Sequence, residues 1–424
     1  MSAGFFGLSF NVVAEESSSE YSFDMSAYEK SPYSFGGYFE LRWEHLNLNQ
    51  EAALYELSEY QAQALNKNDT YAAALQFESR FQGENWMLYA RFNPESYQNE
   101  LRTESVFNTH ELYASWKANS SFSVDAGKKL LKWGKGYAWN PVGFVERAKD
   151  PNDPDLAREG YGVLTADWIN SRSGDLRTLT LSPVYLPVRE DLNSDFGSEH
   201  NNTAIKLYML YKDTDIDFMY LANGSFTPRF GFDFSKNLLT NFEVHGEWAR
   251  ITNFAEKSLD AFGVVSSNIH DANKWLLGFR YLNALDTTFI AEYYFNGTGL
   301  DGDSMENFYA LVDAIPQQAD PATARAKALA LAQSGFLKQS NMRQYLYLRI
   351  QQKDAYDILY FSPALTLIQN IEDHSYNLVP ELLYTGITNL ELRARANIIR
   401  GGDNSEFAEK QNSAKGEIRA RYSF

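Results

Sequence analysis

Cysteine is absent from the 424-residue chain. Without it, disulfides, thiolate metal sites, haem attachment through Cys-x-x-Cys-His and cysteine nucleophiles are excluded. The sequence also lacks any run of about 18 or more apolar residues, which is the length that a membrane-spanning helix requires. Helical membrane proteins are therefore excluded as a class.

Basic residues are scarce relative to acidic ones. Lys and Arg number 38 against 55 Asp and Glu, which gives a formal net charge of -17 and a sequence pI of about 4.9. Because phosphate binding favours a basic surface, nucleic acid is not expected as a partner.

Signatures of catalysis and metal binding are missing too. The 6 histidines are scattered without His-x-x-x-His spacing, and Gly-x-Ser-x-Gly, P-loop and dinucleotide patterns do not occur. Asp150, Asp153 and Asp155 could offer oxygen ligands to calcium, but they lack the turn Gly and the distal Glu of an EF-hand loop. We therefore expect no catalytic residues, no metal, no cofactor and no enzymatic activity.

Aromatic residues are abundant, at 15% of the chain, although the mean hydropathy is -0.43. The combination follows from alternation: Tyr71–Gln82 carries apolar residues on one face and polar residues on the other, and the pattern resumes after the turn 83–85. In lipid, strands must close into a barrel so that every backbone group is paired. The sequence therefore predicts an all-β fold, a transmembrane antiparallel up-and-down β-barrel.

Segments of this kind recur from Gly36–Leu46 to Ser413–Phe424. We count about 18 of them, with 16 possible because Tyr161–Ile169 and Arg229–Lys236 alternate least clearly. Short turns alternate with long connectors over most of the chain, as barrels of this kind require. The even strand count places both termini on the periplasmic side.

Seven long connectors between predicted strands are distributed along the chain. They are 47–70, 94–106, 132–160, 190–202, 253–273, 297–342 and 400–412. The alternation is interrupted at 224–228 and 371–374, where a long connector is expected and few residues are available.

One connector has helical character. Asp320 is a suitable N-cap, Pro321 suits the first helical position, an Ala-rich stretch follows and Gly335 closes it. With residues 305–315 before it, this predicts a helical insertion at about 303–337, serving either as a lid or plug over a pore or as an exposed decoration.

The N-terminus differs from the rest. Residues 1–14 contain an apolar stretch ending in Val12-Val13-Ala14, typical of the tail of an export signal, but they have no basic start. We expect residues 1–35 to be a residual export signal or a flexible N-terminal segment, and residues 36–424 to form the barrel.

The chain ends Arg419-Ala-Arg-Tyr-Ser-Phe424, an alternating strand that closes on an aromatic residue. This ending resembles the C-terminal signature of bacterial outer-membrane proteins, and Trp133-Gly-Lys-Gly-Tyr-Ala-Trp-Asn-Pro141 is similar to segments of porin-like barrels. The resemblance is to the class of Gram-negative outer-membrane porin-like β-barrels. It implies a place in the cell outer membrane, in contact with its lipid.

Charged residues fall on the lumen faces of the predicted strands. If the apolar faces meet lipid, the following residues line the lumen: Arg393, Arg395, Arg419, Arg421, Glu78, Arg80, Arg91, Glu243, Glu247 and Glu292. They could select solutes by charge, as in porins, where a basic wall faces acidic groups. The alternative is that they pair across strands.

The third long connector is the candidate constriction loop, since general porins fold such a loop into the lumen. Its candidate residues are Trp133, Lys135, Tyr137, Trp139, Arg147, Asp150, Asp153 and Asp155. Glycines permit tight turns, prolines stiffen the loop, and the aromatic residues could anchor it or stack on a sugar ring. The alternative is a rigid external loop.

These observations predict an outer-membrane porin-like channel for passive diffusion of small hydrophilic solutes. A barrel of this width leaves an aqueous lumen that is filtered by its charge and its third loop. Two alternatives stay open: a scaffold that sheathes a periplasmic or lumen-filling partner, such as a multihaem electron conduit or an exported polymer, and an outer-membrane enzyme. A homotrimer is a further option.

Overall fold

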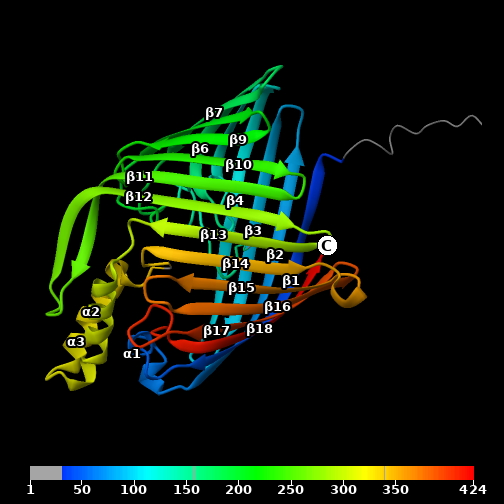
Figure 1. Cartoon of the computed structure of the whole chain (residues 1–424). Helices are drawn as coiled ribbons and strands as arrows, with labels where there is room; N and C mark the ends of the chain where they lie inside the picture. The colour runs from blue at the N-terminus through cyan, green and yellow to red at the C-terminus, as the bar shows by residue number, and fades with distance from the viewer. Residues whose placement is uncertain (1–30, 155, 157, 339) are drawn as a thin grey trace, which may run out of the picture. The chain divides into compact units, whose positions relative to one another are not determined.

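The computed structural model describes residues 31–424 except 155, 157 and 339. Residues 33–424 form one compact unit, a closed antiparallel barrel of 18 strands in which β1 pairs with both β2 and β18 (Figure 1). The strands are β1 (Tyr33–Leu48), β2 (Lys67–Gln82), β3 (Trp86–Gln98), β4 (Thr103–Asn119), β5 (Phe122–Lys129), β6 (Tyr161–Ser171), β7 (Leu176–Leu186), β8 (Asn202–Tyr211), β9 (Thr214–Leu221), β10 (Arg229–Leu239), β11 (Phe242–Leu259), β12 (Val265–Leu282), β13 (Thr287–Asn296), β14 (Gln344–Gln352), β15 (Phe361–Asn370), β16 (Tyr376–Ile387), β17 (Leu390–Arg400) and β18 (Asn412–Ser423).

Each strand pairs with its neighbours in the sequence, and the barrel closes through β1 and β18. The predicted all-β, up-and-down fold is confirmed. The count is 18 and not 16, because β6 and β10, the two weakest predictions, are both paired strands. Strand β1 begins at Tyr33, somewhat before the expected boundary at 36. The predicted export signal lies outside the described residues.

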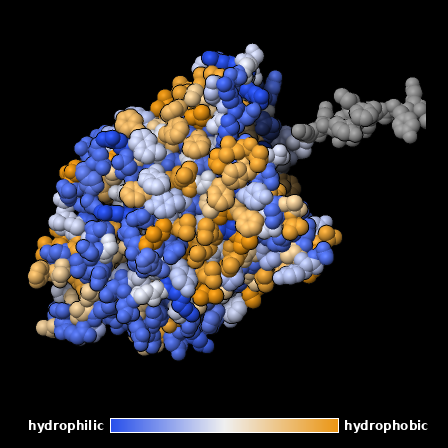
Figure 2. All heavy atoms as spheres, in the orientation of Figure 1, coloured by the Kyte–Doolittle hydropathy of each residue, from blue (hydrophilic) through white to orange (hydrophobic). Residues whose placement is uncertain are grey.

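The alternation that predicted the strands separates two environments. On β18, Ile418 is 54% exposed whereas the neighbouring Glu417 and Arg419 are 2% and 4% exposed. Apolar side chains therefore point outward, as lipid requires, and polar side chains point into the lumen. Figure 2 shows apolar residues gathered over the middle of the visible strands, while the end with the helices is mainly hydrophilic. No helix among the described residues combines the length and apolarity needed to span a bilayer.

The connectors differ between the two ends of the barrel. At the end that holds the C-terminus most turns are short, and at the other end, here the loop end, lie α1 (Ala53–Glu56), α2 (Gly302–Asp313) and α3 (Pro321–Leu331) (Figure 1). Short 3-10 or π turns occupy Gln61–Gln63, Ile315–Gln317, Ala332–Phe336 and Ala355–Asp357.

Two predicted long connectors are wrong. The expected loops 94–106 and 253–273 are mostly strand, because β3 and β4 continue to a connector at 99–102, and β11 and β12 continue to one at 260–264. In these strand extensions apolar and polar residues no longer alternate. The backbone hydrogen bonds between the paired strands nevertheless continue, because strands in water do not need an apolar face toward lipid.

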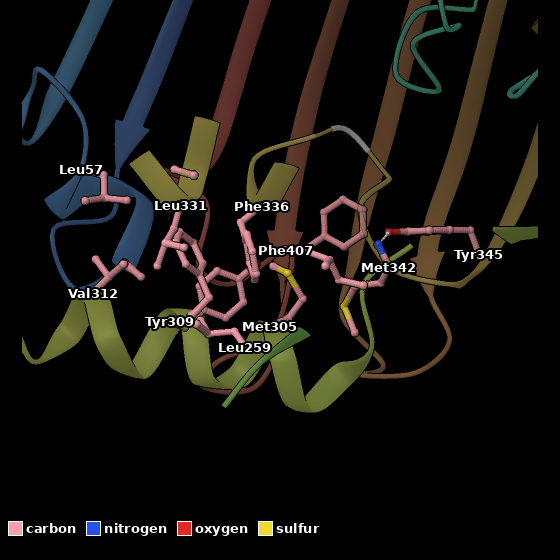
Figure 3. Packing of buried hydrophobic residues seen from close by; sticks show 14 of the residues in the cluster. Leu57, Leu259, Met305, Tyr309, Val312, Leu331, Phe336, Met342, Tyr345 and Phe407 are labelled. Carbon is pink, nitrogen blue, oxygen red and sulfur yellow. Dashed lines mark hydrogen bonds between the residues drawn. The ribbon is translucent and has the colours of Figure 1, made fainter. Parts of the chain in front are cut away.

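The helical insertion is confirmed. Its helices are N-capped by Asp301 and Asp320, whose side chains accept hydrogen bonds from the backbone N–H of Ser304 (2.7 Å) and Thr323 (3.2 Å). Figure 3 shows Met305, Tyr309 and Val312 of α2 packing with residues from other loop-end segments, Leu57 and Phe407 among them. The Arg325 guanidinium of α3 donates to the carbonyls of Glu56 and Ser58, each at 3.1 Å. The insertion is thereby fastened to the rest of the loop end.

Candidate constriction of the barrel lumen

The third loop, residues 130–160, connects β5 to β6 but makes its main contacts elsewhere. One part binds the wall formed by β9, β11 and β13, and another part binds the wall formed by β16, β17 and β18. In the closed barrel these walls are separated by β14 and β15 on one side and by β1 to β8 on the other, and the loop itself is attached at β5 and β6. The loop therefore lies across the lumen.

Two buried carboxylates hold the first part of the loop. Glu247 accepts from the backbone N–H groups of Lys135 (2.6 Å), Gly136 (2.6 Å) and Val142 (3.2 Å). Glu292 accepts from the N–H groups of Tyr137 and Ala138, the latter at 2.8 Å. Glu247 is 3% exposed and Glu292 is 1% exposed. Both were predicted to line the lumen, and the structure places them under the loop as its backbone acceptors.

The glycines of Trp133–Pro141 permit this close approach. Gly134 has a φ of 98°, and a Cβ there would lie 2.7 Å from Oε1 of Glu247. A Cβ at Gly136 would lie 2.4 Å from the carbonyl oxygen of Trp139. Larger residues would push the loop away from the carboxylate that binds it.

The two tryptophans of this segment are anchors. Trp139 stacks on Tyr294 with ring centroids 5.1 Å apart, and its Nε1 donates to Ser340 at 2.9 Å. Trp133 packs edge-on against Phe144. Both side chains are buried, at 5% exposure for Trp139 and 3% for Trp133, so they act as packing anchors.

Lys135 and Tyr137 add polar attachments. The Lys135 Nζ lies 2.7 Å from Oδ2 of Asp217 and 3.9 Å from Oδ1 of Asp233. Burial alone would lower the pKa of Lys135, but these two carboxylates outweigh it and raise that pKa above its ordinary value. The Tyr137 hydroxyl donates to Glu243 at 2.9 Å.

The second part of the loop contacts arginines of β17 and β18 through Asp153. We call Arg393, Arg395, Arg419 and Arg421 the arginine wall. The Asp153 carboxylate lies 3.6 Å from Arg393, 3.3 Å from Arg395 and 3.3 Å from Arg419. Beside it, Asn377 donates to the side-chain oxygen of Asn152 at 2.7 Å. Here the residues expected in two separate sets, the arginine wall and the loop, come together.

The arginine wall is largely neutralised from within. Arg395 and Arg419 bind Glu417 at 2.8 and 2.9 Å, and Arg421 binds Glu40 at 2.7 Å. Glu40 belongs to β1, which pairs with β18 because the barrel closes. Sequence reasoning missed Glu40, although its alternating strand and the closing pair β1–β18 contained the signal.

An open cavity of about 260 Å³ lies between the third loop and the barrel wall formed by β12, β13, β14, β16 and β17. We call it the eyelet cavity. The loop contributes Tyr137, Asn152, Asp153 and Pro154. The charged wall residues are Arg280, Arg349, Glu381 and Arg393, with Arg349 bound to Glu381 at 2.9 Å. Arg280, Arg349 and Glu381 were not predicted, although each lies on the lumen face of a strand. Charges of both signs surround this passage.

The remaining predicted residues lie away from the eyelet cavity. On the wall formed by β2 to β4, Arg91 binds Glu111 at 3.0 Å and is the cross-strand partner of Glu78, while Arg80 lies over the Tyr89 ring at 5.7 Å.

Arg147 pairs with Glu159 at 3.4 Å, and Asp150 accepts from the N–H of Asn152 at 2.8 Å. Asp155 lies outside the described residues. In the part of the chain that the structure describes, no group of His, Asp and Glu side chains is arranged to hold a metal.

Comparisons with known proteins inform the fold. No family model matches the chain, and no curated protein matches it. Among solved structures, OccK5 (OpdH) of Pseudomonas aeruginosa is 12% identical with a TM-score of 0.51, over 92% of this chain and 98% of that one. OpdQ of the same organism is 10% identical with a TM-score of 0.55, over 93% and 99%. OccAB1 of Acinetobacter baumannii is 9% identical with a TM-score of 0.53, over 92% and 96%. At these identities the likeness concerns the fold, and the chain has the porin-like β-barrel fold.

Proposed function

We propose that the chain is an outer-membrane porin-like channel through which small hydrophilic solutes diffuse passively. The eyelet cavity supports this proposal, since it lies between the third loop and charged residues of the barrel wall. In this proposal the cavity is part of the solute path, and the third loop narrows that path. Both termini face the periplasm in this proposal, and the barrel contacts outer-membrane lipid through its apolar belt. No cofactor and no catalytic step are involved.

In this proposal, transport depends on the cross-section of the passage and on the electric field between its charged walls. The third loop sets the cross-section, and the water left in the passage lies between charged walls where fields are focused. Arg280 and Arg349 present positive charge, while Asp153 and Glu381 present negative charge. A dipolar solute gains most when it aligns between them, so the eyelet cavity orients solutes as well as excluding large ones.

The sheath alternative is less well supported. A partner threaded through the barrel needs a continuous bore, and the third loop is fastened to both sides of the lumen. The homotrimer stays a prediction.

Single-channel recording in planar bilayers tests the proposal. We expect steady conductance from the purified barrel, with a reversal potential under a salt gradient that shifts toward cation selectivity in Arg349→Gln. Arg177→Gln, which removes an exposed cation near the start of β7, is the matched control and should leave the reversal potential unchanged. A correctly folded barrel that does not conduct would contradict the proposal.

A further inference from the structure

A second cavity, of about 450 Å³, lies between the third loop and the segments at the loop end of the barrel. Four cationic side chains line it, from four separate elements: Lys149 of the third loop, Arg229 of β10, Lys274 of β12 and Lys338 of the insertion. We call it the cation pocket. Arg229 and Lys274 are half-buried, and Lys338 is exposed.

Three of these cations have no acidic partner among the described residues. No ion pair within the described residues involves Arg229, Lys274 or Lys338, and the charged neighbours that act on Lys274 are themselves cations. Arg229 lies over the Phe226 ring at 4.1 Å, and its Nε has no hydrogen-bond partner there. Lys149 donates to the carbonyl of Gly136. The carboxylates of Glu247 and Glu146 act favourably on Lys149, so the uncompensated charge is that of Arg229, Lys274 and Lys338.

The other polar groups of the pocket are already used. Glu146, the lining carboxylate, is 8% exposed and binds Arg158 at 3.1 Å. Asn140 donates to that same carboxylate at 2.8 Å, and Asn296 donates to the carbonyl of Ser340 at 3.1 Å. What remains to bind a ligand is positive charge.

Such clustering is unexpected in a chain of net charge -17. Confined cations without counter-charges repel one another and raise the free energy of the fold, and a bound anion would remove that cost. The four cations of the pocket come from four separate segments, so no single amphipathic strand or helix brings them together.

We propose that the cation pocket binds a small, multiply charged oxyanion of the phosphate or carboxylate class. The inference deepens the proposed channel function and rests on it for access from the loop end. The pocket adjoins the eyelet cavity through one short segment, since Trp139 lines the pocket and Tyr137 lines the eyelet cavity.

Isothermal titration calorimetry on the detergent-solubilised full chain tests the site. Sodium pyrophosphate and sodium citrate are the probes, titrated at constant sodium chloride. We expect saturable binding of one anion per barrel, weakened about tenfold or more in Arg229→Gln, Lys274→Met and Lys338→Gln. Raising the salt concentration should weaken it further. Lys327→Gln, an exposed cation on α3 outside the pocket, is the matched control and should bind like the wild type.

The outcomes separate the sources and the two proposals. Binding of pyrophosphate alone assigns the phosphate class, binding of citrate alone assigns the carboxylate class, and binding of both supports the shared chemistry. No saturable heat with either probe, or unchanged binding in the pocket variants, overturns the inference.

Folding is checked by heat-modifiable electrophoretic mobility. If Lys274→Met fails to fold, Lys338→Gln decides, because Lys338 is exposed on the insertion. If the barrel conducts but does not bind the probes, the proposed channel function stands and the proposed anion site is rejected.

Discussion

The arginine wall and the cation pocket are both rich in positive charge, but three of the four pocket cations lack the counter-charges that the wall contains. Arg395, Arg419 and Arg421 bind Glu417 and Glu40 across paired strands. Arg229 and Lys274 lie in the same barrel without any such partner among the described residues. Charge placed within strand register is used to hold the fold together, whereas charge left without a partner is available to a solute.

Glu247→Ala should have the largest effect, because it removes the acceptor of several loop N–H groups. We expect unfolding free energy to fall by about 3 kcal/mol and conductance to rise as the loop loosens. Thermal unfolding followed by electrophoretic mobility, with single-channel recording, measures both. Glu243→Ala removes one hydroxyl contact with the loop and should change each by less. Equal effects would mean that the loop is held by other contacts.

Asp153→Asn should make the arginine wall resemble the cation pocket. It leaves Arg393, Arg395 and Arg419 without the loop carboxylate, so anion selectivity should rise and stability should fall by about 2 kcal/mol. The reversal potential under a salt gradient reports the first effect, and denaturation reports the second. An unchanged reversal potential would show that the wall is already neutral to passing ions.

Ala148→Glu should make the cation pocket resemble the wall. The position is exposed, lines the pocket and precedes Lys149, so the new carboxylate supplies the missing counter-charge. We expect pyrophosphate affinity to fall about tenfold by calorimetry, with little change in stability. Ala148→Gln, of similar size but neutral, should bind as the wild type does.

Arg177→Ala should have the smallest effect and sets the baseline. Its ion pair with Asp213 at 2.9 Å joins side chains that are 61% and 72% exposed. Water and salt screen such pairs, so stability should stay within about 0.5 kcal/mol of the wild type. A loss comparable to that of Asp153→Asn would remove the distinction between exposed and enclosed charge.

Most of the fold could be predicted from sequence because lipid imposes a local pattern on every strand. Even β6 and β10 keep enough alternation to be found. The pattern ends where water begins, so the extensions of β11 and β12 were missed. Helix capping is equally local, which is why the insertion was predicted well.

The site was predicted less completely because its chemistry depends on contacts between distant segments. Alternation places Glu247 inside the barrel, but no strand pattern reveals that loop N–H groups cover it. The sequence alone could not show that Asp153, and not Asp150, binds the arginines of the opposite wall. Arg229, Lys274 and Lys338 are isolated in sequence and meet only in the folded barrel.

The seam between β1 and β18 has a consequence for assembly. Glu40 and Arg421 bind each other across 381 positions of sequence, so this contact requires nearly the whole chain. A slip of one residue would turn the Glu40 carboxylate toward lipid. The barrel therefore cannot close until its first and last strands are both present, and the ion pair at the seam then favours one register.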